Sequence, residues 1–307
     1  MAHELIFLGT SAGVPTRQRN VSALALRGES SKGWTLFDCG EGTQHRIMQT
    51  SLSVYHLERI FITHLHGDHV YGLFGLLASR GMTQATTPLE LYGPAGIREM
   101  VETIMRLSQL HLPFDLKIFE IDEGFSMRAG DMRIDAVALS HSLPSYGFVV
   151  RFDDRPGRFD AAKAKALGIP EGPLYARLKQ GGSVTLPDGR TVEGHTLVGP
   201  PIRGKRLAIG GDNDDPLLFA PYAPFDLMVH EATYTQKDFD SLPRKFKHTT
   251  ARHLAQAAQK MGIKRLILTH ISPRYDEKER ILELLEEARA HFDGEVEAAY
   301  DFMRVTI

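Results

Sequence analysis

The chain has 307 residues, of which 42% are apolar and 24% charged, with a formal net charge of −2 at pH 7. This composition is typical of a soluble globular protein, and the length suits one large domain or one domain with an insertion. No long apolar span or signal peptide is found, so we expect no membrane association. Cys39 is the only cysteine, which excludes a disulfide within the chain and favours a reducing cytoplasm.

The net charge does not favour a nucleic-acid partner, but its distribution is uneven. Residues 151–206 hold eleven Lys/Arg against six Asp/Glu, a local balance of +5 that leaves −7 for the rest of the chain. A basic segment on an acidic body indicates a localised electrostatic footprint. Charges that merely scatter unevenly would explain the same counts equally well.

The first third of the chain is predicted to be rich in strands. Short apolar runs, each ending at a polar or glycine-rich turn, indicate strands. A short helix over Gln44–Gln49 follows, with Thr43 as its cap, and another helix begins near Asp68. The predicted strands are Leu5–Leu8, Val21–Leu26, Trp34–Phe37 and Arg59–Ile62.

The middle third continues this alternation. Ile97, Val101, Ile104 and Leu107 recur at helical spacing, so we expect a helix with these four side chains in the core. Strands are predicted on either side of it, over Leu89–Tyr92, Leu116–Ile121, Phe125–Met127, Met132–Leu139 and Tyr146–Phe152.

The character of the chain changes between about Asp153 and Gly204. This stretch is rich in Pro, Gly and basic residues, shows weak apolar periodicity and contains one short helix over Ala161–Leu167. We interpret it as an inserted arm and not as part of the core. Regular structure then resumes with strands at Arg206–Ile209, Leu227–Val229 and Leu266–Leu268, with helices from Thr249 or Thr250 to Met261 and over Glu277–His291, and with two short final strands.

The most informative motif is Thr63-His64-Leu65-His66-Gly67-Asp68-His69. His64 and His66 are two residues apart in an extended segment and point to one side, while Asp68 and His69 fall in the first turn of the next helix. Four ligands within six residues can converge on one or two ions, and zinc favours imidazole and carboxylate donors. The alternative is a solvated loop with a chance run of histidines.

Further polar residues follow other predicted strands. Asp38, His141, Asp212, the His230–Glu231 pair and His270 each come directly after an apolar run. Sites in layered α/β folds gather where strands end, because the backbone there is rigid and faces a crevice. One such histidine is usually a surface residue, but this many segments together with the first motif predict a single metal centre.

The order His-x-His-x-Asp-His followed by a distant His, Asp and His resembles the ligands of the metallo-β-lactamase fold. The sequence resembles the ribonuclease Z family more specifically, through Phe7–Thr16, Phe37–Gln44, the run Pro15-x-Arg17-x-Arg19-Asn20, and His230-Glu231-Ala232-Thr233. This resemblance implies an α/β fold, a four-layer αββα sandwich. A single domain, residues 1–307, would carry a flexible basic arm, residues 153–204, as an exosite for tRNA.

The resemblance also implies the metals and the reaction. His64, His66 and His141 would bind one Zn²⁺, Asp68, His69 and His270 a second, and Asp212 would bridge the two. Manganese or magnesium could replace zinc at such sites. A hydroxide held between the metals would cleave precursor tRNA endonucleolytically, leaving a 3′-hydroxyl on the tRNA and a 5′-phosphate on the trailer. Additional 3′-exonuclease activity is left open.

Catalytic roles come from the same resemblance. Asp68 would accept a proton, and Glu231 would orient His248, which would stabilise the transition state or protonate the leaving oxygen. Alternatively, His248 is a surface residue beside a helix and Glu231 a buried carboxylate that serves stability. The chain also departs from the family at Asn213, which follows Asp212 where Thr is usual; an Asn amide can still hydrogen-bond.

Substrate contacts are expected from the arm and from loops near the metals. The resemblance favours Arg17, Arg19 and Asn20 in one loop, Gly172 and Pro173 in the arm, and Arg274 after the last metal ligand. Its implied partners are precursor tRNA and a second copy of the chain in a homodimer. Two other hypotheses remain at this point: a hydrolase of small phosphodiesters, lactones or thioesters, and a non-catalytic RNA-binding scaffold with a structural metal.

Overall fold

The computed structural model describes residues 3–28 and 31–307. Its chain divides into two compact units, which are described separately. The larger unit contains the residues up to Ala129, Arg133–Val150 and Arg206–Ile307, and the smaller one contains Gly130–Met132 and Arg151–Lys205. No helix among the described residues is long and apolar enough to cross a membrane.

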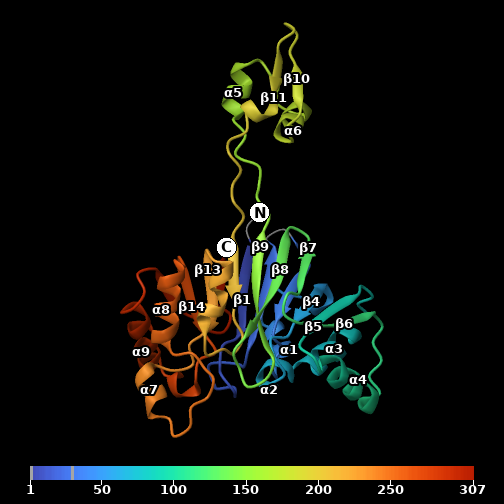
Figure 1. Ribbon diagram of the computed structural model, residues 1–307. Helices are drawn as coiled ribbons and strands as arrows, with labels where there is room; N and C mark the ends of the chain where they lie inside the picture. Colours follow the sequence, from blue (N-terminus) through green and yellow to red (C-terminus); the bar gives the residue numbers. More distant parts are fainter. Residues whose placement is uncertain (1–2, 29–30) are drawn as a thin grey trace. The chain divides into compact units, whose positions relative to one another are not determined.

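Two seven-stranded sheets are found among the described residues of the larger unit (Figure 1). The first sheet has the order β16 (Arg304–Thr306), β1 (His3–Gly9), β2 (Ala23–Gly28), β3 (Trp34–Phe37), β4 (Leu57–Phe61), β5 (Leu89–Gly93) and β6 (Leu116–Glu120). The second has the order β15 (Glu295–Ala298), β14 (Arg265–Thr269), β13 (Leu227–Glu231), β12 (Arg206–Ile209), β9 (Ser145–Phe152), β8 (Met132–Leu139) and β7 (Ser126–Ala129).

Each sheet contains parallel neighbours. Strands β3 to β6 pair in parallel, as do β12 to β15, whereas β16, β1, β2 and β3 pair antiparallel. Because parallel strands end at the same edge of a sheet, the loops after β3 and β4, and those after β12, β13 and β14, gather at two sheet edges. Six of the seven predicted metal ligands follow β4, β12 or β14, and the seventh, His141, follows β8.

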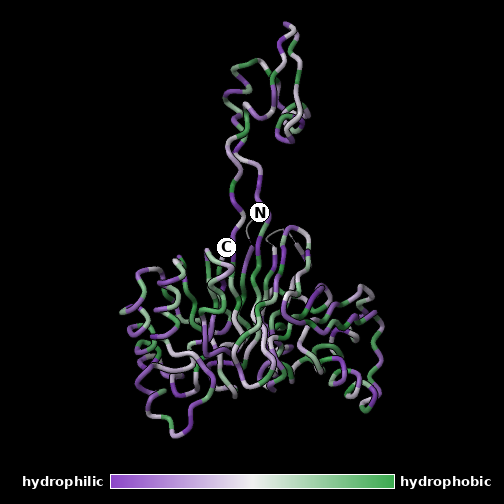
Figure 2. Tube along the Cα trace, in the orientation of Figure 1, coloured by the Kyte–Doolittle hydropathy of each residue, from purple (hydrophilic) through white to green (hydrophobic). Residues whose placement is uncertain are grey.

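Helices cover the outer faces of both sheets. Apolar side chains of α1 (Thr43–Ile47), α3 (Leu73–Met82) and α4 (Ile97–Ser108) share a core with the first sheet, and those of α8 (Ala251–Met261) and α9 (Lys278–Arg289) share one with the second. Figure 1 shows these two groups of helices on opposite sides of the strands, and Figure 2 shows hydrophobic segments along the central strands. The predicted αββα layering is confirmed. Shorter helices are α2 (Gly67–Val70) and α7 (Gln236–Ser241), with 3₁₀ turns at Val54–His56, Pro216–Tyr222 and Pro273–Tyr275.

Aromatic rings join the inner faces of the two sheets. The Phe61 ring stacks on those of Phe37 and Tyr92, with centroids 5.3 and 4.7 Å away, and it meets Phe148 of β9 edge-on at 5.0 Å. Aromatic pairs in this geometry contribute about 0.5–1.5 kcal/mol each beyond the area they bury. The inter-sheet packing therefore holds together the two edges from which the site residues come.

Most predicted elements are confirmed, with two corrections of detail. Thr43 does not cap α1: the N-cap residue is Gly42, in a left-handed conformation with φ 77°, and the Thr43 hydroxyl donates to the Gly40 carbonyl instead. Ile97 and Val101 are in the core as predicted, but Ile104 is only half-buried and Leu107, in the last turn of α4, is 70% exposed. Cys39 is fully buried and packs in the core of the first sheet, where burial raises the pKa of its thiol.

The smaller unit has a core of its own. It contains α5 (Ala161–Ala166), α6 (Pro173–Lys179), a hairpin of β10 (Ser183–Thr185) and β11 (Thr191–Glu193), and a 3₁₀ turn at Gly194–Thr196. Tyr175, Leu178 and Val184 are among the buried residues that pack together there. Helices of six and seven residues span fewer than two turns, which is why their apolar spacing is hard to recognise in the sequence.

Candidate metal centre

The loop after β4 carries the His64–His69 motif, and Asp38 holds it in place. Asp38 follows β3 and is buried, with a left-handed φ of 58°. Its Oδ1 accepts a hydrogen bond from the Thr63 amide at 2.8 Å, and its Oδ2 lies 3.0 Å from the Thr63 hydroxyl and 2.7 Å from His69 Nδ1. Because His69 Nδ1 donates to a carboxylate, its Nε2 is left free to bind a metal.

Gly40 allows the two loops to approach. A Cβ at this position would lie 2.3 Å from the Asp68 carbonyl oxygen, which no other residue could tolerate without a shift of backbone. The close approach lets the Cys39 amide donate to the His69 carbonyl at 2.8 Å and the Gly72 amide donate to the Cys39 carbonyl at 2.9 Å. The motif is therefore fixed by backbone as well as by side-chain hydrogen bonds.

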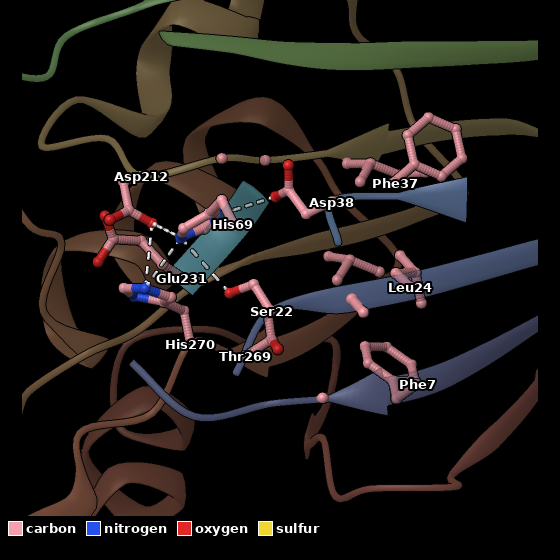
Figure 3. Close-up of a pocket in the computed structure, with 16 residues that line it drawn as sticks. Phe7, Ser22, Leu24, Phe37, Asp38, His69, Asp212, Glu231, Thr269 and His270 are labelled. Atoms are coloured by element: carbon pink, nitrogen blue, oxygen red, sulfur yellow. Dashed lines mark hydrogen bonds and ion pairs between the residues drawn. The ribbon is translucent and has the colours of Figure 1, made fainter. Parts of the chain in front are cut away.

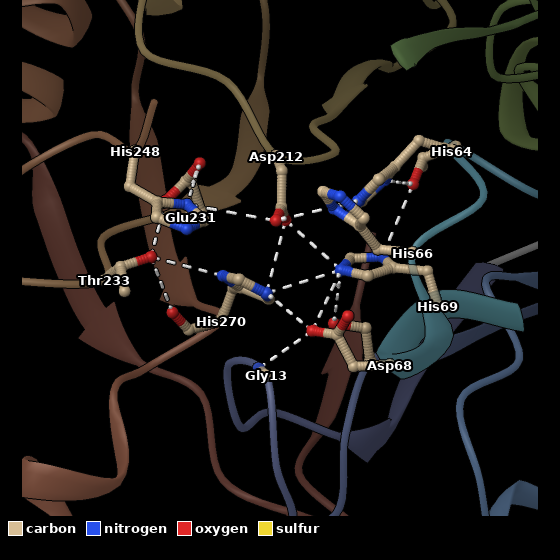
Figure 4. Close-up of polar contacts among 12 residues, drawn as sticks. Gly13, His64, His66, Asp68, His69, Asp212, Glu231, Thr233, His248 and His270 are labelled. Atoms are coloured by element: carbon tan, nitrogen blue, oxygen red, sulfur yellow. Dashed lines mark hydrogen bonds and ion pairs between the residues drawn. The ribbon is translucent and has the colours of Figure 1, made fainter. Parts of the chain in front are cut away.

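Four of the predicted ligands form a first group. His66 Nδ1 lies 3.0 Å from His64 Nε2 and 3.1 Å from His141 Nε2, and Asp212 Oδ2 lies 3.7 and 3.9 Å from the same two nitrogens (Figure 4). The ligand atoms of all four residues lie within 4.8 Å of one another. The pKa of His64 is lowered by burial, so its imidazole is neutral, the form that binds metals.

The other predicted ligands form a second group. His270 Nε2 lies 3.3 Å from both His69 Nε2 and Asp68 Oδ2, and Asp68 Oδ2 is 3.5 Å from His69 Nε2. Asp212 Oδ1 lies 3.2 Å from both histidine nitrogens. His270, like Asp38, has a left-handed φ, 51°. Such a conformation in a residue other than glycine is uncommon and concentrates at functional sites.

Asp212 belongs to both groups, and its chemistry fits divalent metals. Its Oδ1 is buried and makes no hydrogen bond among the described residues. Burial opposes the charge of this carboxylate, but His270, His69 and His64 outweigh it and lower its pKa. Burial likewise opposes the charge on Asp68, where His270 and His69 lower the pKa. Two carboxylates and five imidazoles whose nitrogens face each other are the N/O donor set of a borderline divalent metal.

A small cavity lies between the sheets behind this cluster. It has a volume of about 40 Å³, which leaves room for a buried water. Figure 3 shows Asp212, His69 and His270 at one end and Phe37, Leu24 and Phe7 at the other. The apolar end keeps bulk water from the inner side of the cluster, so electrostatic interactions there are stronger than at the surface.

Glu231 and His248 meet beside the metal ligands. Glu231 ends β13 and is buried; its two oxygens lie 3.1 and 3.2 Å from His248 Nδ1. Burial opposes a charge on His248, but Glu231 outweighs it and raises the pKa of His248 to about 9. Burial opposes the charge on Glu231 too, and His248 outweighs it and lowers the pKa of Glu231. His248 Nδ1 is 3.8 Å from Asp212 Oδ2.

Asn213 connects four loops of the second sheet. Its Oδ1 accepts from the amides of Ser140 and Asp215, each at 3.1 Å, and its Nδ2 donates to the Asp215 carbonyl at 2.8 Å and lies 3.2 Å from His230 Nε2. Its own amide donates to Glu231 Oε1 at 2.6 Å, and its carbonyl accepts from the Thr249 hydroxyl. A threonine side chain has one donor and cannot make all four side-chain contacts.

The predicted substrate-binding residues Arg17, Arg19 and Asn20 differ in exposure. Arg17 is exposed, whereas Arg19 is buried and its Nη1 donates to the Thr10 hydroxyl and the Ala299 carbonyl. Asn20 Nδ2 donates to the Glu41 carbonyl at 2.9 Å. Arg19 and Asn20 thus stabilise the loop itself, and their role toward a substrate stays a prediction.

Two further predictions fall in different units. Arg274 is exposed, and its guanidinium carbon lies 5.0 Å from the centroid of the Tyr234 ring, which lines the cavity at the metal cluster. Gly172 and Pro173 belong to the smaller unit, where they are the N-cap and first residue of α6. Proline at this position is favoured because its missing N–H would be unpaired anyway. Their contact with substrate also stays a prediction.

One wall of the larger cavity at the metal cluster was not predicted from the sequence. This cavity of about 590 Å³ is lined by the metal ligands His66, Asp68, His141, Asp212 and His270, by His248, and by Arg244, Lys245, Phe246 and Lys247. The run Arg-Lys-Phe-Lys directly before His248 was the available signal: three cations and an aromatic next to a predicted catalytic residue.

Two facing sheets with a His/Asp cluster at one edge define a metal-dependent hydrolase of the metallo-β-lactamase fold. The metallo-β-lactamase fold protein YhfI from Bacillus subtilis superimposes with a TM-score of 0.68, 16% identity and full coverage of both chains. A family model described as Anti-Pycsar protein Apyc1 matches residues 3–156, which end before Asp212 and His270.

Relatives that match almost the whole chain give the family. Ribonuclease BN of Enterobacter sp. (strain 638) is 46% identical and the match covers 99% of this chain and 100% of the relative. Ribonuclease Z of Geobacillus kaustophilus (strain HTA426) is 45% identical, with 99% of each chain covered. Human tRNase Z, short form, has a TM-score of 0.68, 28% identity and 98% coverage of both chains. The chain belongs to the ribonuclease Z family.

The Asp38 contacts predict the effect of a conservative change on metal binding. In Asp38→Asn an NH₂ group replaces Oδ2, and an NH₂ group cannot accept a hydrogen bond from the Thr63 hydroxyl or from His69 Nδ1. The proton of His69 would move to Nε2, and zinc affinity would fall about 10–100-fold. Elemental analysis after dialysis against buffered zinc measures this. Asp115→Asn, the same change on an exposed side chain, is the control; equal zinc content in both variants would contradict the prediction.

Proposed function

We propose that this protein is a metal-dependent endonuclease that removes the 3′ trailer from precursor tRNA. The cut would leave a 3′-hydroxyl on the tRNA and a 5′-phosphate on the trailer. One observation carries the proposal: seven His/Asp ligands cluster beside the Glu231–His248 pair, in a chain that matches ribonuclease Z relatives over almost its whole length. A reducing cytoplasm, suggested by the single buried cysteine, would be its location.

We assign two Zn²⁺ per subunit to the cluster, with Mn²⁺ or Mg²⁺ as substitutes. His64, His66 and His141 would hold one ion, Asp68, His69 and His270 the other, and Asp212 would reach both through its two oxygens. When bound, two such ions make a nucleophile available at neutral pH and stabilise the attacking and leaving oxygens of a phosphodiester.

The protein's own groups would manage the protons. Asp68 Oδ2 is held by the Gly13 amide at 2.8 Å and is ionised, so it can accept a proton from the attacking nucleophile. Glu231 accepts from His248 Nδ1 and also from the Thr233 hydroxyl at 2.5 Å, which fixes the imidazole ring. With its pKa raised to about 9, His248 is protonated at neutral pH and can stabilise or protonate the leaving 3′ oxygen.

The test is incubation of the purified protein with a tRNA precursor that carries a 3′ trailer. We expect a single endonucleolytic cut that disappears with a chelator and returns with zinc. Asp68→Ala and His248→Ala should each lower kcat by about 10²–10⁴, the usual contribution of a general acid or base. Glu102→Gln, on the exposed face of α4, is the control and should not change kcat. Failure of the wild-type protein to cut, with metal present, would contradict the proposal.

We propose further that the smaller unit binds tRNA and that the protein acts as a homodimer. Helices α5 and α6 carry the exposed cations Lys163, Lys165, Arg177 and Lys179. Such cations neutralise backbone phosphates and give affinity that depends on salt but not on sequence. In a dimer, the smaller unit of one subunit would hold the tRNA that the other subunit cleaves.

A mixing experiment tests both parts. Asp68→Ala lacks the proposed proton acceptor of the active site. Lys165→Glu/Arg177→Glu weakens the proposed tRNA binding by the smaller unit. Each variant alone should cleave precursor tRNA slowly, and an equimolar mixture should recover activity through dimers that combine the intact parts. Lys165→Glu/Arg177→Glu alone should have a raised KM for precursor tRNA. The slope of log KM against log salt concentration should fall by about 0.7–0.9 for each phosphate that this variant no longer binds. A mixture that is only as active as the sum of its parts would contradict action across a dimer.

A further inference from the structure

The loop of residues 243–247 lies between α7 and His248 and lines the cavity of the metal cluster. Arg244, Lys245, Phe246 and Lys247 all contribute to this lining, together with Tyr234 and the ligands His66 and His141. We call residues 243–247 the basic loop. Its side chains border the space in which the scissile phosphodiester must lie for any cleavage at these metal ligands.

The cations of the basic loop lack carboxylate partners. Arg244, Lys245 and Lys247 are exposed, and none of them forms an ion pair in the part of the chain that the structure describes. Lys247 Nζ lies 3.3 Å from the Ser140 hydroxyl, and Lys245 Nζ donates to the Phe239 carbonyl. The acidic residues of the same cavity, Asp68 and Asp212, face histidines. Uncompensated positive charge at a cavity attracts an anionic ligand.

Phe246 adds an aromatic surface among these charges. Its side chain is 51% exposed, and the guanidinium carbon of Arg244 lies 5.6 Å from the ring centroid. A lone exposed apolar residue needs no explanation. An aromatic ring flanked by unpaired cations on the wall of a reactive cavity is different, because this combination binds single-stranded nucleic acid: cations contact phosphates and bases stack on the ring.

The backbone of the basic loop is tied to the metal centre. The Lys247 carbonyl accepts from His141 Nδ1 at 3.1 Å, and the His248 amide donates to the Phe246 carbonyl at 2.9 Å. The loop therefore sits at a defined place beside a metal ligand and the predicted acid. The loop makes these two contacts through the carbonyl oxygens of Phe246 and Lys247. They therefore leave the Phe246 ring and the Arg244 guanidinium available to a ligand.

We propose that the basic loop is a subsite for the unpaired nucleotides that flank the scissile bond. Arg244 and Lys247 contact their phosphates, and Phe246 stacks on a base. This inference rests on the proposed function, because it presumes an RNA substrate with single-stranded nucleotides at the cut. It assigns local recognition to the larger unit, separate from any contact that the smaller unit makes with the body of the tRNA.

The test compares KM, kcat and bound zinc among variants of the basic loop. Phe246→Ala should raise KM for a precursor tRNA with a single-stranded trailer about tenfold, within the range known for removal of one stacking ring, with kcat unchanged. Phe246→Tyr should keep the wild-type KM. In Arg244→Gln/Lys247→Gln, the slope of log KM against log salt concentration should fall by about 0.7 for each phosphate that the loop no longer binds. Bound zinc, measured by elemental analysis, should be the same in all variants as in the wild type.

Controls separate this role from a structural one. Arg106→Gln/Leu107→Ala removes an exposed cation and an exposed apolar side chain from α4 and should change neither KM nor kcat. A Phe246→Ala variant that loses bound zinc would show a merely structural loop and overturn the inference. If the wild-type protein cleaves the precursor and Phe246→Ala has the same KM as the wild type, the inference is overturned too. A wild-type protein that does not cleave the precursor overturns the proposed function, and the inference with it.

Discussion

The Asp38 carboxylate is the interaction on which the metal centre most depends. Its two oxygens accept from the Thr63 backbone, the Thr63 hydroxyl and His69, so one buried side chain fixes both the start and the end of the His64–His69 motif. A buried carboxylate is costly unless it is hydrogen-bonded, and here three donors offset the cost. These hydrogen bonds orient His69 and anchor the His64–His69 motif to the end of β3.

Glu231 plays the corresponding part in the second sheet. It ends β13, as Asp38 follows β3, and it accepts from the Asn213 amide, the Thr233 hydroxyl and His248. Asp212, next to Asn213, places a carboxylate from the second sheet beside ligands from the first, with its Oδ1 3.2 Å from His69 Nε2. The centre needs ligands from both sheets, and the aromatic contact between Phe61 and Phe148 is part of the packing that holds the two sheets together.

Local features of the site could be predicted from the sequence, and long-range ones could not. The His64–His69 motif and the polar residues after β12, β13 and β14 were recognisable because a strand end leaves a short sequence signature. The role of Asn213 could not be predicted, because only the fold brings its side chain to Ser140, Asp215 and His230. Nothing in the sequence indicates that Arg19 is buried. Its side chain donates to the Ala299 carbonyl, 280 residues away in the chain, and only the fold brings the two together.

The basic loop shows a further limit. Its five residues resemble an ordinary solvated stretch, and only the fold shows that residues 244–247 line the cavity and that the Lys247 carbonyl contacts His141. Helical spacing also misled at Leu107, because periodicity says which face a residue occupies but not whether another element covers it. The smaller unit escaped recognition as a packed body for the related reason that its helices are too short to display a period.

The proposed chemistry requires that the two sheets together build two metal sites that share Asp212. Anomalous diffraction at the zinc edge, from crystals of the zinc-loaded protein, can locate the ions. We expect two peaks about 3.5–4 Å apart, one among His64, His66 and His141 and one among Asp68, His69 and His270, with Asp212 touching both. A single peak at full loading, or peaks away from these residues, would contradict the shared site.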